Sequence, residues 1–121
     1  EYKVPVLYRQ SGVKEADIFF ISYFNPSLNL DKDKDFIEGN FTKLYDYLEK
    51  NYGVFTTVSD EEITAMIPTE KLQKILNISE KIPILCRKRL VYDRFGQKIE
   101  YNIGYYRADR FSYNINLKRE V

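Results

Sequence analysis

The chain is 121 residues long, which suits one domain with one hydrophobic core. Lys and Arg number 19 against 18 Asp and Glu, and this near balance excludes the basic surface that tight binding to duplex DNA requires. The sequence has no histidine, which excludes Ser-His-Asp and Cys-His catalysis and the usual zinc sites. These absences argue against an enzyme, a metal site or a bound cofactor.

The remaining composition is typical of a globular protein. Apolar residues make up 44% and aromatic residues 16% of the chain, enough to build a core. The longest apolar run is too short to span a bilayer, and no secretory signal opens the sequence. The single cysteine, Cys86, excludes an internal disulfide and fits a reducing compartment, so the sequence predicts a cytoplasmic location without membrane contact. The start at Glu1 rather than Met indicates a fragment of a longer protein.

The first elements are a hairpin and a loop. Residues 3–10 and 16–24 are rich in β-branched and aromatic residues, and "SGVKE" separates them, which predicts a β-hairpin. Residues 25–35 break this pattern with an Asn-Pro pair and alternating charges. The charged part of this segment, residues 31–35, is typical of a solvated loop.

The clearest helix is predicted over residues 39–53. Asn40 suits its N-cap and Gly53 its end. The apolar residues between them recur at helical spacing: Phe41, Leu44, Tyr45, Leu48 and Tyr52.

A strand, a second helix and three further strands follow. The β-branched residues of 54–67 predict a strand, and 68–78 predict a short helix that starts at Pro68 and Thr69. Residues 82–93, 97–108 and 110–120 predict three strands. A turn around Gly96 joins the first two, and the short link between the last two makes them antiparallel neighbours. The order of elements predicts an α+β fold with a mostly antiparallel sheet.

The strand within residues 97–108 has one unusual face. Counting with period two places Ile99, Tyr101, Ile103 and Tyr105 on one side, which reads as ordinary packing. The other side holds Glu100, Asn102, Gly104 and Tyr106. A carboxylate, an amide, a gap and a phenol in succession are an unusual set for one face of a strand.

The ordered series of local motifs resembles the UTRA domain, the effector-binding domain of HutC-type regulators in the GntR family. The resemblance is strongest in "KILNISEKIPILCRKRLVYD" and "IEYNIGYYRADRF", and it extends back through "LYDYLEKNYGV" to the first hairpin. It implies a chorismate-lyase-like α+β fold and one domain over residues 1–121. It also implies that the domain's first strand and helix, and a winged helix-turn-helix that binds operator DNA as a dimer, lie outside this sequence.

The resemblance further implies a function and a site. In that family the domain binds a small metabolite, which changes operator binding by the attached heads, and it acts as a homodimer. The glutamate of "IEY" and the second tyrosine of "YYR" hold the effector there; here these are Glu100 and Tyr106, the pair already placed on one face by period-two counting. Arg9 and Thr57 correspond to two further effector positions.

Three family positions have lost charge or polarity in this sequence. The second arginine of an Arg-x-Arg pair is Ser11, the arginine of a Ser-Arg pair is Val58, and a glutamate of the second strand is Ile21. These departures favour an effector that is less charged than a sugar phosphate. They also keep two alternatives open: a chorismate-lyase-like enzyme in which Glu100 acts as an acid, and a dimerisation module whose pocket has decayed.

Three structural roles are also predicted. Arg107, Asp109 and Arg110 form a salt-bridged corner, Gly104 either makes room for a ligand or marks a bulge, and Cys86 is a small buried apolar residue.

Overall fold

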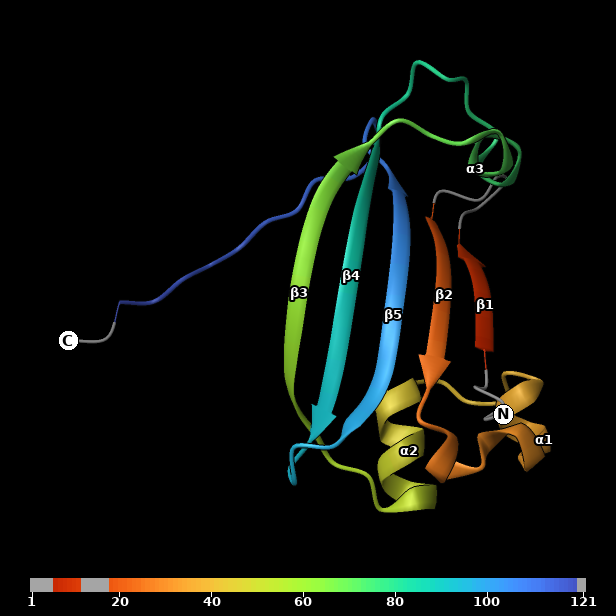
Figure 1. Cartoon of the computed structure of the whole chain (residues 1–121), viewed down its shortest axis with the longest axis vertical. Coiled ribbons are helices and arrows are strands. Elements are labelled where there is room, and N and C mark those ends of the chain that lie inside the picture. Colours follow the sequence, from red (N-terminus) through yellow and green to blue (C-terminus); the bar gives the residue numbers. More distant parts are fainter. Residues whose placement is uncertain (1–5, 12–17, 120–121) are drawn as a thin grey trace.

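One antiparallel sheet with short helices at its two ends makes up the molecule (Figure 1). The structure is a computed structural model that describes the backbone of residues 6–11 and both backbone and side chains of residues 18–119. The strands are β1 (Val6–Ser11), β2 (Ile18–Phe24), β3 (Thr56–Met66), β4 (Ile84–Asp93) and β5 (Lys98–Arg107). They lie in the order β1-β2-β5-β4-β3, and every neighbouring pair is antiparallel. The predicted α+β class is confirmed.

The segment predicted as a loop is partly helical. It contains two single 3₁₀ turns, η1 (Pro26–Leu28) and η2 (Leu30–Lys32), and is followed by the one-turn helix α1 (Lys34–Ile37). Asp33 is not a solvated charge, because its carboxylate caps α1 by accepting a hydrogen bond from the backbone N–H of Phe36. The prediction was wrong here because Leu30, which is fully buried, ties the segment to the core.

The main helix α2 (Leu44–Tyr52) begins later than predicted. Its N-cap is Lys43, whereas the side-chain amide of Asn40 donates to the carboxylates of Asp35 and Glu38 at the end of α1. Phe41 lies outside the helix and stacks on Phe36, with ring centroids 5.8 Å apart. The predicted end was right: Gly53 closes α2 with φ of 64°, a value that favours glycine.

Two hydrophobic clusters lie on opposite faces of the sheet. At one end, α3 (Glu70–Leu76) packs Leu72 and Leu76 against Phe19 of β2. At the other end, α2 packs Leu48 against Phe24, also on β2. Because Phe19 and Phe24 are five positions apart, strand alternation places them on opposite faces. Each face is therefore covered by a helix at one end only (Figure 1).

The last predicted strand, residues 110–120, is absent as such. Residues 111–119 are extended but pair with no strand among the described residues, and they project from the body beyond β3 (Figure 1). Among the described residues, β5 pairs with β2 and β4. Both of its edges are thus occupied, which leaves no place for a strand beside it.

Two structural expectations hold, the second of them for the pair of Arg107 with Asp109. Cys86 is buried and free, as a small apolar residue would be. The guanidinium of Arg107 pairs with Asp109 through Nε at 3.1 Å and Nη2 at 2.8 Å, which fixes the corner after β5.

Candidate functional site

The candidate site is the sheet face that holds the residues Glu100, Asn102, Gly104 and Tyr106 of β5, called here the polar face. Cross-strand register sets its composition, because residues directly opposite each other lie on the same face. On β2 the opposite residues are Phe24, Ser22, Phe20 and Ile18, and on β4 they are Val91, Arg89, Arg87 and Leu85. The face predicted from the sequence as polar therefore gains two arginines from its neighbour strand.

Glu100 lies at the α2 end of this face and is buried, with 3% of its surface exposed. Its Oε1 accepts a hydrogen bond of 2.5 Å from the hydroxyl of Tyr45, which projects from the first turn of α2. Burial, followed by the Glu100 charge, raises the pKa of Tyr45 well above its usual range. Glu100 is thus a buried carboxylate that accepts a hydrogen bond from the neutral hydroxyl of Tyr45. It is not a surface residue paired with Lys98 or Arg89.

Arg89 stands at the centre of the polar face and is held by a carboxylate. Its Nε donates to Oε1 of Glu61 on β3 at 2.6 Å, and the hydroxyl of Tyr113 donates to Oε2 of the same carboxylate at 2.7 Å. The Tyr113 hydrogen bond and then Arg89 lower the pKa of Glu61, although burial opposes them. Glu61 is therefore charged at neutral pH and fixes the direction of the guanidinium.

Thr57 lies in a β-bulge between Thr56 and Val58, where β3 and β4 shift register. It borders a hollow of about 130 Å³ that also includes side chains already described. The lining residues are Tyr45, Thr56, Thr57, Val58, Ser59, Arg89 and Val91. Since the Tyr45 hydroxyl also bonds Glu100, two of the predicted residues, Thr57 and Glu100, are brought to the same end of the polar face.

Two buried polar atoms on the polar face lack a hydrogen-bond partner: Nε of Arg87 and Oδ1 of Asn102. The side-chain amide of Asn102 donates to Oγ of Ser22 at 2.7 Å, which orients Asn102 and leaves its oxygen unpaired. The guanidinium of Arg87 lies 5.5 Å from the ring centre of Tyr106. Buried donors and acceptors without partners are rare in folded proteins, and a bound water, ion or ligand is one way in which they are satisfied.

Tyr106 lies at the other end of the face, six residues along β5 from Glu100 and so about 20 Å away along the strand. It borders a second cavity of about 180 Å³ together with Arg87 and the segment that follows β5. The lining residues are Ile63, Leu85, Arg87, Tyr106, Phe111, Ser112 and Tyr113. Glu100 and Tyr106 therefore share a face without sharing a cavity, and Arg87, Arg89 and Asn102 lie between them.

The gap expected at Gly104 is filled by protein. A Cβ at this position would lie 2.8 Å from the ring of Tyr106 and 3.1 Å from the ring of Phe20. Those two rings meet edge to face, with centroids 5.7 Å apart. The register of β5 runs unbroken through Gly104, so it does not mark a bulge either. Here glycine allows two aromatic rings to approach the strand.

Arg9, the remaining predicted site residue, lies in β1. The backbone register sets it opposite Phe20, which in turn lies opposite Gly104. Arg9, Phe20, Gly104 and Arg87 thus occupy one row across four strands. The side chain of Arg9 lies outside the described part of the structure.

Sequence reasoning missed Tyr45, Arg87 and Arg89 as site residues. Tyr45 recurs at helical spacing with apolar residues, and this pattern predicts a packing role and gives no sign of its hydroxyl contact. The signal for the arginines was the alternation "RKR" at residues 87–89, which places Arg87 and Arg89 on one face and Lys88 on the other. Only the pairing of β4 with β5 shows that this face is the one that holds Glu100.

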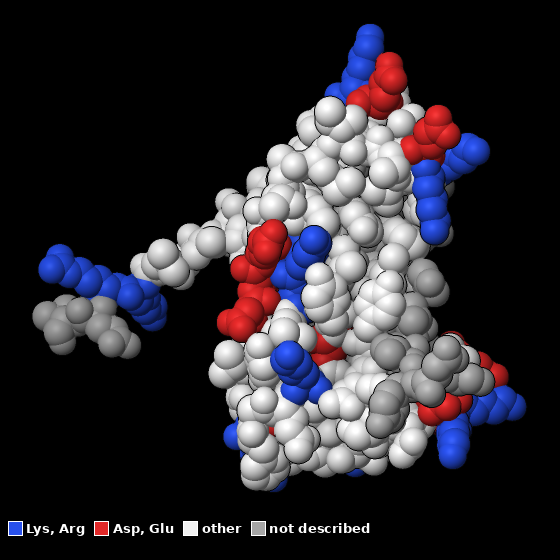
Figure 2. Space-filling view, in the orientation of Figure 1, with Lys and Arg blue, Asp and Glu red and all other residues white. Residues whose placement is uncertain are grey.

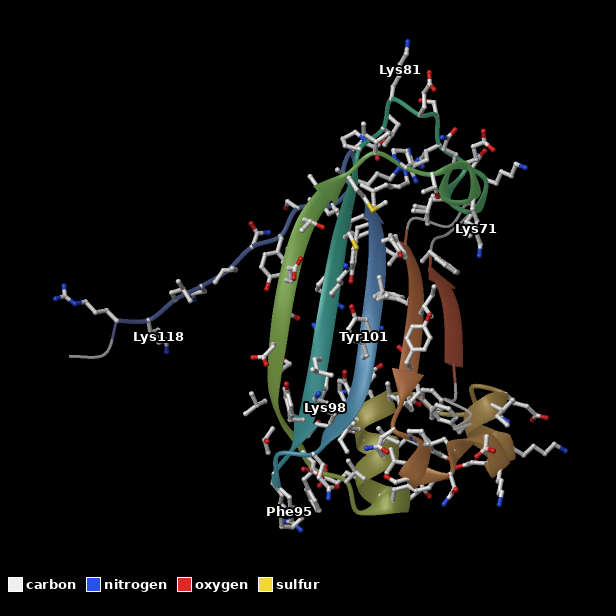
Figure 3. The ribbon with its side chains drawn as sticks, in the orientation of Figure 1. Lys71, Lys81, Phe95, Lys98, Tyr101 and Lys118 are labelled. Carbon is white, nitrogen blue, oxygen red and sulfur yellow. The ribbon has the colours of Figure 1, made fainter. Side chains whose placement is uncertain are left out.

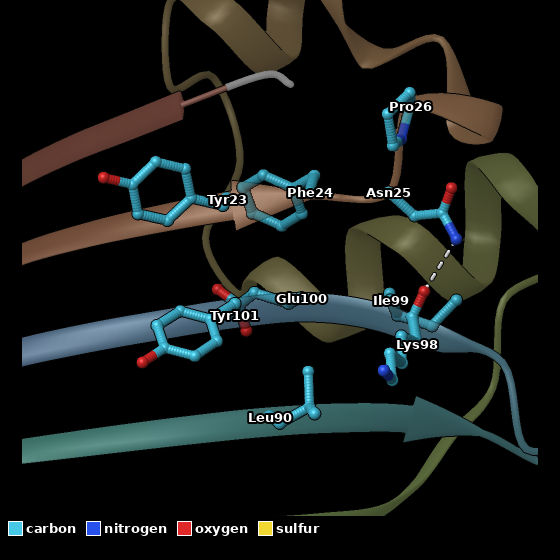
Figure 4. A pocket seen from close by; sticks show the side chains of 9 residues that line it. All are labelled: Tyr23, Phe24, Asn25, Pro26, Leu90, Lys98, Ile99, Glu100 and Tyr101. Atoms are coloured by element: carbon cyan, nitrogen blue, oxygen red, sulfur yellow. Dashed lines mark hydrogen bonds between the residues drawn. The ribbon is translucent and has the colours of Figure 1, made fainter. Parts of the chain in front are cut away.

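A wider, shallow hollow of about 540 Å³ lies near the end of β5, mainly on the opposite face of the sheet, and its lining also includes Phe24 and Glu100 of the polar face (Figure 4). Tyr23 and Tyr101 border it with their rings 6.3 Å apart, and the side-chain amide of Asn25 donates to the backbone oxygen of Lys98 at 2.8 Å. No buried, unpartnered polar side-chain atom of the described residues belongs to its lining. The polar face is therefore the better candidate for a specific ligand site.

The described residues contain no group of three or more His, Cys, Asp or Glu side chains that could hold a metal ion. In the same part of the chain, none of the helices is both long and apolar enough to cross a membrane.

Solved structures share this fold. The chain superposes with a TM-score of 0.83 on a GntR-family transcriptional regulator from Enterococcus faecalis, at 23% identity and over 97% of this chain and 83% of that one. It also superposes with a TM-score of 0.83 on the ligand-binding domain of a GntR-family regulator from Bordetella bronchiseptica, at 20% identity and over 95% and 72% of the two chains. The fold is thus that of a domain found in transcriptional regulators.

The chain belongs to the UTRA domain family, whose model matches residues 13–112. Two curated relatives from Escherichia coli agree. The mannosyl-D-glycerate transport/metabolism system repressor MngR is 28% identical over 76 residues, which cover 63% of this chain and 32% of MngR. The HTH-type transcriptional regulator GgaR is 28% identical over 68 residues, covering 56% and 27% of the two chains. The chain thus spans about a third or less of the length of these two curated relatives.

Proposed function

We propose that this chain is the effector-sensing domain of a GntR-type transcriptional regulator of the HutC kind. A small metabolite binds the polar face, and its different affinity for two states of the regulator changes DNA binding by a part that lies outside this chain. The observation that supports the proposal best is the pair of buried, unpartnered atoms, Arg87 Nε and Asn102 Oδ1, on one sheet face.

These atoms, together with their neighbours, indicate a class of effector. Nε of Arg87 requires an acceptor, and Oδ1 of Asn102 requires a hydroxyl or amino donor. Arg89 adds a second guanidinium to the same face, although Glu61 balances its charge. A hydroxylated anion, with a carboxylate or phosphate group, meets both requirements. The arginines of β4 thus offset the charge lost at Ser11 and Val58, and the effector class that we propose is more anionic than the sequence alone predicted.

The proposal assigns no chemical step to the domain. The relatives are transcriptional regulators, and Glu100, the carboxylate that β5 contributes to the polar face, is already bonded to Tyr45. A buried carboxylate that already accepts one hydrogen bond from a neutral hydroxyl can accept another from a ligand. We therefore assign Glu100 to binding rather than to acid-base chemistry.

Matched ligands test the proposal. Thermal shift and calorimetry on the 121-residue chain would compare gluconate with sorbitol and glucose 6-phosphate with glucose, so that each anion has a neutral counterpart. We expect an anion to bind and Glu100→Gln to weaken its affinity about 10- to 100-fold, because a buried hydrogen bond to a charged group is lost. Glu49→Gln, which changes an exposed carboxylate on α2, is the control and should bind like the parent.

Other outcomes would decide for the alternatives. Binding of no compound in a panel widened to amino acids, nucleosides and fatty acids would favour a dimerisation module with a decayed pocket. Turnover of chorismate, followed by the release of pyruvate, would favour the enzyme. If substitutions at Glu100, Arg87 and Tyr106 all left the ligand affinity unchanged, the binding site would lie elsewhere.

The proposal includes a homodimer, cytoplasmic action on operator DNA through a separate DNA-binding part, and no contact with a membrane. A two-fold dimer allows one effector-induced change to reposition two DNA-binding heads together. Sedimentation of the chain at high micromolar concentration tests this part, and a monomer there would contradict it.

A further inference from the structure

The segment that follows the sheet has the sequence of a strand without a strand partner. Phe111, Tyr113, Ile115 and Leu117 alternate with Ser112, Asn114, Asn116 and Lys118. This period-two pattern is typical of a strand that packs one face against an apolar surface. In the described residues the segment is extended but unpaired, and Tyr113, Ile115 and Leu117 are 45%, 63% and 85% exposed.

The root of this segment is fixed and its remainder is not packed. The hydroxyl of Tyr113 donates to Glu61 at the middle of β3. Beyond this point the chain leads away from its own sheet, so that Lys118 lies well clear of the body (Figure 3). Residues 115–118 thus do not lie along the β3 edge of their own chain, and the apolar side chains of Ile115 and Leu117 remain uncovered.

The β3 edge offers what such a strand needs. β3 is eleven residues long and pairs only with β4 among the described strands, so its outer backbone groups are open to a further strand. Its middle is acidic through Asp60, Glu61 and Glu62. Figure 2 shows acidic side chains along this margin and basic ones at the end of the projecting segment, where Lys118 and Arg119 lie.

Charge selects between the possible pairings. In a two-fold dimer, direct pairing of one β3 with the other would bring two acidic stretches together, and like charges on adjacent strands are destabilising. A segment that ends in Lys118 and Arg119 is attracted to the same edge. Residues 114–119 span about 20 Å when extended, which is enough for a strand of ordinary length.

We propose that residues 114–119 add a strand to the β3 edge of a second copy of this chain, and that the second copy returns the same contact. The exchange covers two exposed apolar segments and two open edges at once, as a closed two-fold interface does. It rests on the dimer included in the proposed function and names the elements that form it. Because Tyr113 and Glu61 also border the polar face, the exchange links effector binding to the partner subunit.

Sedimentation equilibrium and hydrogen exchange test the exchange. Ile115→Ser combined with Leu117→Ser should weaken dimerisation at least 100-fold, because each buried aliphatic side chain accounts for about 10-fold or more. Ile37→Ser, which changes an exposed isoleucine on α1, should leave it unchanged. The backbone amides of β3 should exchange slowly in the parent dimer and rapidly in the double variant.

A charge swap separates this contact from a general loss of stability. Lys118→Glu with Arg119→Glu should weaken the dimer, and combining them with Asp60→Lys and Glu62→Lys should restore it, whereas Lys50→Glu on α2 should have no effect. A dimer that survives removal of residues 114–121 with its β3 amides still protected would overturn the exchange and leave the dimer itself standing. A monomeric parent chain would overturn both.

Discussion

The hydroxyl of Tyr45 donates a 2.5 Å hydrogen bond to Oε1 of Glu100 and so joins the first turn of α2 to one end of the central strand β5. The two residues are 55 positions apart in the sequence. This contact keeps a buried carboxylate satisfied at the end of the polar face, and it makes α2 the element that would respond if an effector reached Glu100.

The contact predicts an asymmetry between two substitutions. Tyr45→Phe leaves a buried carboxylate without its donor and should lower the free energy of unfolding by about 1.5–3 kcal/mol. Glu100→Gln keeps an acceptor for the tyrosine and should cost about 1 kcal/mol or less. Urea denaturation of the two variants and the parent measures both values. If Tyr45→Phe were as stable as the parent, the hydrogen bond would not hold Glu100 in solution.

Gly104 predicts a packing effect. Valine suits a strand, but its Cβ would meet the ring of Tyr106 at 2.8 Å and that of Phe20 at 3.1 Å. The Tyr106 ring cannot easily move, since Phe20 and Phe111 contact it at centroid distances of 5.7 Å and 5.8 Å. Gly104→Val should therefore destabilise the fold by about 1–3 kcal/mol.

A double substitution provides the control for Gly104. In a Tyr106→Leu background the nearest ring is gone, so Gly104→Val should cost clearly less than in the parent. Equal costs in both backgrounds, measured by thermal or urea unfolding, would show that the ring contact is not the cause.

The sequence predicted most elements because their signals are local. The strands at 54–67, 82–93 and 97–108 and the helix end at Gly53 follow from alternation and from the conformation that glycine adopts. The polar row on β5 also followed from counting by two. The sequence could not predict which strands pair. The sheet order places β4 beside β5, and this pairing adds Arg87 and Arg89 to the row.

The errors have the same origin. Residues 110–120 show a correct strand pattern, yet their predicted neighbour β5 already has a strand on each side. The start of the main helix was misplaced because Asn40 has the chemistry of an N-cap but binds side chains of α1 instead. In both cases a local preference was satisfied by a partner that the sequence does not reveal.

The near-neutral charge predicts weak binding to DNA by this chain alone. With 19 basic and 18 acidic residues, few phosphate contacts can form without repulsion nearby. We expect no saturable binding to duplex DNA below about 100 µM at physiological salt. Basic proteins that bind DNA non-specifically already associate with it at such concentrations. Fluorescence anisotropy with a salt series measures this, and tight, salt-sensitive binding would contradict the assignment of operator contacts to another part of the regulator.

The last prediction concerns Asp33, whose carboxylate joins α1 to α2. Its Oδ2 accepts hydrogen bonds from the hydroxyls of Tyr47 at 2.6 Å and Tyr52 at 2.5 Å, while Oδ1 caps α1 at the N–H of Phe36. The bonds from Tyr47 and then Tyr52 lower the pKa of Asp33. The hydrogen bond from Tyr47 to Asp33 raises the pKa of Tyr47 to about 12. Burial, followed by the hydrogen bond from Tyr52 to Asp33, raises the pKa of Tyr52.

The two directions of shift predict loss of stability at both ends of the pH range. A lowered carboxyl pKa stabilises the fold above the unfolded value of about 4, and this contribution is lost as the pH falls through the folded pKa. A raised phenol pKa stabilises the fold below the unfolded value of about 10, and this contribution is lost as the pH rises towards about 12. Between these limits the contribution of this cluster should be constant.

Urea denaturation followed by circular dichroism from pH 2 to pH 12 tests the cluster. Asp33→Asn should lower the stability at pH 7 by about 1 kcal/mol and flatten the acid limb, because no carboxylate remains there to be protonated. Tyr47→Phe with Tyr52→Phe should flatten the alkaline limb in the same way. Asp31→Asn, which changes an exposed carboxylate two residues away, serves as the control and should reproduce the parent profile. An acid limb in Asp33→Asn as steep as that of the parent would mean that other carboxylates, and not the contact between α1 and α2, set the acid stability of the domain.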